Sequence, residues 1–441
     1  MRRCGWNPTR WLSSRCSHKV PRFLSLFLIG ALFLTGFTLS AATLTTKDRV
    51  FLDDLEKRAL RYFMDQADPV TGLVYDRAHT DGSQDPRSLN VTSIAATGFG
   101  LTALCIGAQR HWITDQDAHD RVLRTLQFLL HRAPQKNGFF YHFMDATTGQ
   151  RRYTSEVSSI DTALLLGGIL TAKQYFSNDS EIVNLANRLY RRVDFSWLYR
   201  QQPDQLLHGW RPESGFLKYR WDTYSEASIL YLLGMGSTSH PIPAASWESW
   251  NRPVFQFDNY KYIAAGPLFT YQYSEAWIDF RNKKDSKGID YFENSTIATH
   301  AQRAFCLSLR SKFPKSYSQN VWGITASDSV RGYVAWGGPP LDPATDGTVV
   351  PCAAGGSLMF APDICLRALR TMKSRFYRQI WGRYGFTDAF NPTTGWVDDD
   401  VIGIDLGIIL LSAENLRDDG VWNLFMRNPE VVQAMKLAGF H

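Results

Sequence analysis

The residues Tyr219-Arg220-Trp221-Asp222-Thr223-Tyr224-Ser225-Glu226-Ala227 lead directly into an apolar run over 228–233. A loop rich in aromatic side chains therefore ends at a segment that has no polar face, which predicts a buried helix over 226–235. Glu226 would lie in the first turn of that helix. A carboxylate is costly to desolvate in such a position, so Glu226 is the first candidate for a functional residue.

Helical segments of two kinds alternate along the chain, one kind amphipathic and the other apolar on all sides. The amphipathic or mixed segments cover residues 46–68, 115–132, 180–192 and 291–312. The apolar segments cover residues 92–109, 158–175, 226–235, 355–372 and 404–414, and a terminal helix is predicted over 429–437. Alternations typical of strands are few and short, over 138–143, 216–220 and 269–273.

This alternation predicts a double ring in which the apolar helices form an inner barrel and the amphipathic helices surround it. About a dozen helices in six pairs correspond to an all-α (α/α)6 toroid with short β-hairpins in the loops. A parallel α/β fold is disfavoured because the chain lacks repeated strand-like runs of Val and Ile. No segment resembles a linker, so residues 43–441 are predicted to form a single domain.

The first 42 residues carry the whole excess of positive charge. They contain six basic residues and no acid, and the rest of the chain has 42 basic and 42 acidic residues, which gives no indication of nucleic-acid binding. A basic segment is followed by an apolar run over 23–39 and by the small-residue sequence Leu39-Ser40-Ala41-Ala42. Residues 1–42 are predicted to be a secretory signal peptide, with an uncleaved N-terminal membrane anchor as the alternative. Either reading predicts export, to the periplasm or beyond it, or retention at the inner membrane.

Acidic residues recur at the predicted entries of the inner helices. In a double ring these entries meet at one end, where the positive ends of the helix dipoles favour carboxylates. Paired carboxylates across a cleft are what glycosidic cleavage requires, one as a proton donor and one as a base or nucleophile. The alternative for any one of them is a capping role. The acids are Glu156, Asp161, Asp222, Glu226, Glu275, Asp279, Asp398, Asp399, Asp400 and Asp405.

Other chemistries find little support in the sequence. There is no His/Cys spacing typical of a metal site, no phosphate-binding Gly loop before a helix and no Gly-x-Ser-x-Gly motif. After the leader, Cys105, Cys306 and Cys365 fall on apolar helix faces, where a free Cys behaves as a small hydrophobic residue. One disulfide that involves Cys352 remains an open alternative.

Several motifs resemble those of the bacterial glucoamylase-like family, in consistent order from about Tyr75 to the C-terminus. They are Gly266-Pro267-Leu268-Phe269, Tyr273-Ser274, Trp277-Ile278-Asp279-Phe280-Arg281, Asp290-Tyr291-Phe292, Trp322-Gly323-Ile324-Thr325-Ala326-Ser327-Asp328, Gly332-Tyr333, Ala353-Ala354-Gly355-Gly356-Ser357 and Gly403-Ile404-Asp405. Members include endo-β-1,2-glucanases and a domain of cyclic β-1,2-glucan synthases. The resemblance implies an (α/α)6 fold and action on a β-glucan by inversion, without a metal or another cofactor.

The resemblance also implies roles for three acids. Glu226 matches the acid of the family's Tyr-x-Glu-Ala helix entry and is expected to be the general acid. Asp405 or Asp161 is expected to activate water, with the alternative that Asp161 holds the sugar. The sequence departs from the family at Glu275, where relatives often have His, and at residues 406–408, where Leu-Gly-Ile replaces Gln-Gly-Pro.

A further set of residues is expected to bind the glucose rings by stacking or hydrogen bonds. The set is Asp76, Arg77, Glu156, Tyr219, Trp221, Glu275, Trp277, Trp322 and Trp336. The main interpretation is thus an exported glycoside hydrolase with an oligo- or polysaccharide substrate. Two other classes stay open, a glucan transferase or phosphorylase that uses the same cleft and a non-catalytic glucan-binding protein.

Overall fold

The computed structural model describes residues 44–340 and 344–441. The predicted leader, residues 1–42, lies outside the described residues. No helix within the described ranges is both long and apolar enough to cross a membrane.

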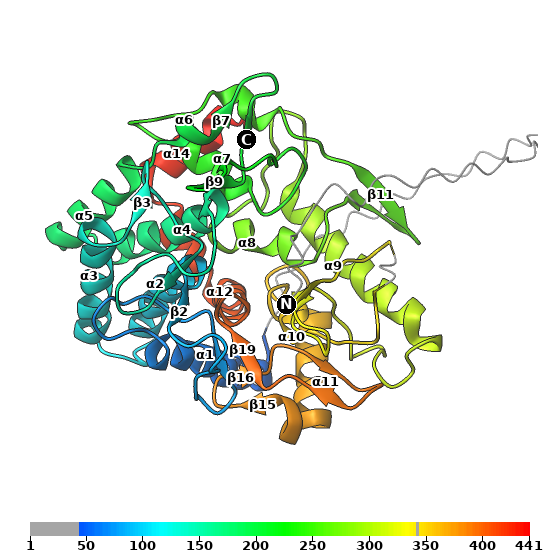
Figure 1. The fold of residues 1–441 in the computed structure, drawn as a ribbon. Coiled ribbons are helices and arrows are strands. Elements are labelled where there is room, and N and C mark those ends of the chain that lie inside the picture. Colours follow the sequence, from blue (N-terminus) through cyan, green and yellow to red (C-terminus); the bar gives the residue numbers. More distant parts are fainter. Residues whose placement is uncertain (1–43, 341–343) are drawn as a thin grey trace, which may run out of the picture.

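Six buried helices form the inner ring of the fold (Figure 1). They are α2 (Ile94–Gln109), α4 (Ser159–Tyr175), α7 (Ser228–Met235), α8 (Phe269–Trp277), α10 (Pro351–Gly355) and α12 (Gly403–Asp418). All eight residues of α7 are buried, and α2 is buried from Ile94 to Ala108, as expected for helices without a polar face. The ring is closed by side chains as well as by packing. Ser274 Oγ donates to the Glu226 carbonyl between α8 and α7, and Gln272 Nε2 donates to the Ala353 carbonyl between α8 and α10.

Amphipathic helices pack against the outside of the inner ring, each against an inner neighbour (Figure 1). They are α1 (Thr46–Asp65), α3 (Asp115–His131), α5 (Ser180–Arg191), α9 (Tyr291–Ser308), α11 (Pro362–Ile380) and α14 (Pro429–Leu437). Two short helices, α6 (Phe195–Leu198) and α13 (Gly420–Phe425), and the 3-10 turns η2 (Ala244–Trp247) and η3 (Leu309–Ser311) complete the helical elements of the described residues. This architecture confirms the predicted (α/α)6 toroid.

The closest approach in the inner ring is between α2 and α4, where two glycines face one another. A Cβ on Gly168 would lie 2.0 Å from the Gly98 carbonyl oxygen, and a Cβ on Gly98 would lie 2.4 Å from the Leu164 carbonyl oxygen. Side chains at either position would therefore separate the two helices.

Short antiparallel strands occupy the loops. The pairs are β1 (Arg77–His79) with β19 (Asp400–Ile402), β2 (Val91–Ser93) with β5 (Phe143–Asp145), β3 (Gln135–Lys136) with β4 (Phe139–Phe140), β7 (Tyr199–Arg200) with β8 (Gln205–Leu206), β11 (Val254–Phe257) with β12 (Tyr260–Ile263), β13 (Ala326–Ser327) with β14 (Val334–Ala335), β15 (Trp381–Gly382) with β16 (Gly385–Phe386), and β17 (Phe390–Asn391) with β18 (Trp396–Val397). A three-stranded sheet has the order β10 (Gly215–Phe216), β9 (Gly209–Arg211), β6 (Val157–Ser158). Three of these strands, β2, β6 and β19, run directly into the inner helices α2, α4 and α12.

Three local predictions were wrong. Residues 269–273, expected as a strand, form the first half of α8, because a short apolar run has the same composition in a buried helix and in a strand. The single helix expected over 355–372 begins only at Pro362 as α11, because residues 356–361 form the turn that follows α10, and Pro362 stands at the start of α11, where a missing N–H is tolerated. Helix α7 begins at Ser228, so Glu226 lies in the turn before the helix instead of in its first turn.

Candidate active site

The entries of the inner helices are tied together by backbone hydrogen bonds from one helix to the loop of a neighbour. The first N–H of α2, from Ile94, donates to the His142 carbonyl at 3.1 Å. The first N–H of α4, from Ser159, donates to the His208 carbonyl at 3.0 Å. The first N–H of α12, from Gly403, donates to the Asp76 carbonyl at 2.8 Å. These contacts satisfy orphan donors of the helices and fix the loops that carry the acidic side chains.

Glu226 is a buried carboxyl group that is only partly compensated by hydrogen bonds. It is 6% exposed, and its Oε2 has no hydrogen-bond partner among the described residues. Burial, with a further contribution from the charge of Asp161, raises the pKa of Glu226 to about 7. A carboxyl group with this pKa is protonated for much of the time near neutral pH and can donate a proton.

Asp161 lies beside Glu226 in the first turn of α4, within a cluster of charged groups. Ser158 Oγ donates to Asp161 Oδ2 at 2.5 Å, and the Asp161 N–H donates back to Ser158 Oγ at 3.2 Å. His142 Nδ1 lies 3.6 Å from Asp161 Oδ2 and 3.3 Å from Glu156 Oε1. Arg211 Nη2 lies 3.0 Å from the other oxygen of Glu156. The structure thus brings the predicted residues Asp161 and Glu156 together through a histidine.

The charges of this cluster shift its pKa values in opposite directions. Burial alone would lower the pKa of His142, but the charge of Asp161 and the hydrogen bond with Glu156 outweigh burial and raise it to about 9. Burial opposes the ionisation of Glu156, yet His142 and Arg211 lower the pKa of Glu156 to about 2. At neutral pH the cluster therefore contains an imidazolium between carboxylates.

Arg77 binds a second group of acids near the helix entries. Its guanidinium contacts Asp328 Oδ2 at 2.5 Å, Asp76 Oδ2 at 3.2 Å and Asp400 Oδ2 at 3.5 Å. Pairing of β1 with β19 sets this arrangement, since Arg77 faces Ile402 and His79 faces Asp400 in the register. Both Asp76 and Arg77 were predicted as site residues, and the structure places them next to α12.

Asp405, in the first turn of α12, has a buried thiol and a buried carboxyl as neighbours. Cys352 Sγ, in α10, lies 3.3 Å from Asp405 Oδ1. Burial, opposed by hydrogen bonds with Asp388 and Cys352, raises the pKa of Asp405 to about 6. Burial and the charge of Asp405 raise the pKa of Asp388 further, well above its ordinary range, so Asp388 holds the proton of this pair.

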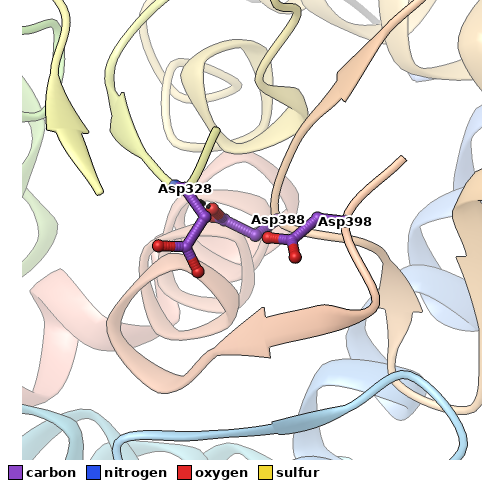
Figure 2. A group of neighbouring side chains, drawn as sticks. All are labelled: Asp328, Asp388 and Asp398. Carbon is purple, nitrogen blue, oxygen red and sulfur yellow. Dashed lines mark hydrogen bonds between the residues drawn. The ribbon is translucent and has the colours of Figure 1, made fainter. Parts of the chain in front are cut away.

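Asp328, Asp388 and Asp398 are near enough to one another to form a candidate metal-ligand set (Figure 2). One oxygen of each lies within 4.8 Å of the others, and the Asp328 N–H donates to Asp388 Oδ2 at 2.7 Å. The Asp328 carboxylate also binds the guanidinium of Arg77. A cation here would have to lie beside a guanidinium and an acid that holds a proton, which fits a divalent metal poorly.

Four of the five predicted aromatic stacking residues are core residues instead of surface platforms, which corrects that expectation. Trp277 Nε1 donates to Thr102, and Gly167 packs against its indole ring. Trp221 stacks on His208 at 3.9 Å and donates to Ser159 Oγ. The buried tryptophans are Trp221, Trp277, Trp322 and Trp336. Of the five predicted aromatic residues, only Tyr219, which is 41% exposed, could offer its ring to a sugar.

Glu275 was also expected at the site, and the structure contradicts this. It lies near the C-terminal end of α8, away from the helix entries, where it is buried and accepts a hydrogen bond from Ser295 Oγ at 2.5 Å. Burial raises the pKa of Glu275 well above its ordinary range, as expected for a protonated core residue. Likewise, the disulfide left open for Cys352 does not form, because the four cysteines of the described ranges are free and buried.

Four residues of the site were not predicted from the sequence, namely His142, Asp328, Asp388 and Tyr333. None of them stands at a predicted helix entry, which was the criterion applied. Tyr333 is 50% exposed, yet burial of its hydroxyl and the charges of Asp405 and Asp388 raise the pKa of that hydroxyl well above its usual range. Its ring therefore borders solvent while its hydroxyl approaches the acids. The Gly332-Tyr333 motif was the one signal in the sequence that indicated it.

Comparison with known proteins supports a carbohydrate site. A family model described as "Putative glucoamylase" matches residues 218–429. An exo β-1,2-glucooligosaccharide sophorohydrolase of Parabacteroides distasonis is 29% identical, and the match covers 90% of this chain and 59% of that protein. This chain therefore spans well under two thirds of that relative.

Solved structures agree with the family match. An endo-β-1,2-glucanase of Chitinophaga pinensis, in complex with sophorotriose and glucose, superposes with a TM-score of 0.83 at 29% identity over 89% of this chain and 98% of that one. A Bacteroides fragilis protein described by the same words as the family model superposes with a TM-score of 0.82 at 31% identity, over 91% of this chain and 99% of that one.

Proposed function

Because the chain belongs to the bacterial glucoamylase-like family of glycoside hydrolases, we propose that it hydrolyses a β-glucan with β-1,2 linkages. The observation that supports this most directly is Glu226, a buried carboxyl group with an unpartnered oxygen and a pKa of about 7. Two of the relatives named above, from Parabacteroides distasonis and Chitinophaga pinensis, are described as enzymes that act on β-1,2-linked glucose chains. The basic and apolar leader, which lies outside the described residues, supports export as part of the same proposal.

In the proposed reaction Glu226 protonates the glycosidic oxygen as the bond to the anomeric carbon breaks. Asp405 removes a proton from a water molecule that attacks this carbon from the opposite face of the ring, which inverts the configuration. The two environments suit these roles, because between about pH 6 and pH 7 Asp405 is ionised while Glu226 keeps its proton. Asp161, with its serine and histidine contacts, is the alternative base and otherwise a ligand for sugar hydroxyls.

The proposal is tested by measuring new reducing ends when the leaderless protein is incubated with β-1,2-, β-1,3-, β-1,4- and β-1,6-glucans. We expect release from the β-1,2-glucan and a loss of at least about 100-fold in the Glu226→Gln variant, the usual contribution of a general acid. Glu213→Gln is the matched control, since Glu213 is an exposed glutamate paired with Arg151. Equal activity of the Glu226 variant and the wild type would contradict the assignment.

Two further readouts separate the alternatives. Proton NMR of the first-formed product should show the anomer opposite to the linkage, and retention would contradict the inverting mechanism. Breakdown that depends on added phosphate would identify a phosphorylase. Binding of β-1,2-glucan without new reducing ends would identify a binding protein.

A further inference from the structure

We propose that His142 is a positioning residue that holds Asp161 and Glu156 as an ordered, ionised pair at the entry of α4. The proposal rests on the hydrolytic function proposed above and adds a residue to it. His142 does not follow from the helix-entry pattern of acids, and its role is assigned from contacts that form only when these segments meet in the folded chain.

The backbone of His142 is fixed on both sides. Its N–H donates to the Glu156 carbonyl at 2.9 Å, and its carbonyl accepts the first N–H of α2 from Ile94. The imidazole ring stacks on Phe143 with 3.9 Å between ring centroids and an angle of 16° between the planes. The ring therefore has a set orientation before any substrate arrives.

In this orientation Nδ1 faces two carboxylates, Glu156 at 3.3 Å and Asp161 at 3.6 Å. Arg211 on β9 binds the far side of Glu156, and Asp76, from the loop before β1, adds a third negative charge near the ring. Glu156 thus has two cations, whereas Asp161 has His142 as the nearest one. Within the described ranges these are the charged groups that face His142 closely.

Two carboxylates that contact the same imidazole nitrogen repel one another, and a positive charge on that ring offsets the repulsion. Removal of the imidazolium leaves Asp161 and Glu156 without the cation between them, and it removes the contacts with His142 that lower the pKa of Glu156, so that Glu156 gains a proton more easily as the pH falls. Asp161, either as a base or as an acceptor for sugar hydroxyls, would then lack the ordered ion pair of His142 and Glu156 beside it. The loss of His142 should therefore reduce hydrolysis more strongly at acidic pH than at neutral pH.

The kinetic experiment compares kcat/KM at pH 5 and pH 7 in wild type, His142→Gln and His142→Arg. We expect the pH 5 to pH 7 ratio to fall about 2-fold in the Gln variant, because a carboxyl group whose pKa rises to the ordinary range or slightly above it is only partly protonated at pH 5. The Arg variant, which keeps a cation, should recover most of the ratio. His119→Gln is the matched control, because His119 lies between Asp120 and Asp179 on the outer helix α3. An unchanged ratio in His142→Gln would overturn the proposal.

A second measurement does not depend on activity. The imidazole of His142 in the wild-type protein, followed by NMR from pH 5 to pH 10, should keep its proton well above pH 7 and lose it at lower pH in Glu156→Gln. Titration of His142 near the ordinary histidine value in both proteins would overturn the proposal. If the wild type releases no reducing ends, the proposed function fails while this titration still decides the role of His142.

Discussion

At the scale of single residues, the site separates proton donor and acceptor by environment. Glu226 is buried with one unpartnered oxygen, whereas Asp405 accepts hydrogen bonds from a thiol and from a carboxyl that holds a proton. The same functional group, a carboxyl, is thus a proton donor in one position and a proton acceptor in the other. This division is the physical basis for the proposed direction of proton transfer.

The first prediction concerns the pH dependence of hydrolysis. Activity should rise as Asp405 ionises near pH 6 and fall as Glu226 ionises near pH 7, which gives a narrow bell centred between these values. Initial rates at low substrate concentration from pH 4 to pH 9 would show it. A Cys352→Ala variant, which removes one hydrogen bond to Asp405, should move the acidic limb to higher pH and leave the basic limb in place. A flat profile across pH 5 to 8 would contradict both assignments.

The second prediction concerns stability at Glu226. Its pKa is raised in the folded state, so its contribution to stability is complete below the ordinary Glu pKa and is lost as the pH rises through about 7. Glu226→Gln, which imitates the protonated form, should therefore match the wild type near pH 4 and exceed it by about 2 to 3 kcal/mol near pH 8. Urea unfolding at both pH values measures this difference. Lower stability of Glu226→Gln than of the wild type at pH 8 would show that other groups stabilise the ionised form of Glu226, and it would contradict the prediction.

At the scale of elements, the strand-to-helix junctions place the site. β2, β6 and β19 each continue into an inner helix, and each helix donates its first N–H to the loop of a neighbour. A loop displaced at one junction therefore displaces the acids of the next. Positions where the helices touch directly should be the least tolerant of change.

The third prediction follows from the contact of α2 with α4. Gly168→Ala places a methyl group 2.0 Å from the Gly98 carbonyl oxygen. This oxygen belongs to the backbone of α2, so it cannot move aside as the end of a flexible side chain could. We expect a loss of about 3 kcal/mol or more in the free energy of unfolding. Gly266→Ala is the control, because a Cβ at Gly266 meets no atom within 4 Å and should change stability little. Equal stability of both variants in denaturant unfolding would contradict the close contact.

The helices and loops also show which parts of the fold and of the candidate site could be predicted from the sequence. The alternation of apolar and amphipathic helices was sufficient to predict the double ring, and the acid before the apolar run at 228–233 was sufficient to single out Glu226. Asp388 and His142 could not be found in this way, because their roles come from loops that meet only in the folded chain. The tryptophans were misassigned because composition does not distinguish a ring that packs in the core from one that borders a cleft.

At the scale of the whole molecule, the fold is held by packing without covalent cross-links among the described residues. The four cysteines there are free, and each is buried in or beside an inner-ring contact or under an outer helix. Burial raises the pKa of the thiols of Cys105, Cys306, Cys352 and Cys365, which keeps them poorly reactive.

The fourth prediction tests this directly on the leaderless protein. Its Tm should be the same with and without a reducing agent, and a thiol reagent such as Ellman's should react with no cysteine in the native state and with four after denaturation. The leaderless protein lacks Cys4 and Cys16, so these two thiols do not add to the count. A Tm that falls on reduction, or fewer than four thiols after denaturation, would indicate a disulfide.

The pairing of β1 with β19 also has a consequence for how the chain is made. His79 and Asp400 are in contact although they are 321 positions apart in the sequence, and α12 packs against α1 and α2. A chain that emerges from its N-terminus must keep the apolar faces of its first helices uncovered until the last inner helix arrives. Such non-local contacts slow folding, because the long loop between the partners must close before any contact compensates for the lost entropy. Newly made chains should therefore depend on chaperones, and a chain cut before β19 should be degraded instead of accumulating as a smaller folded form.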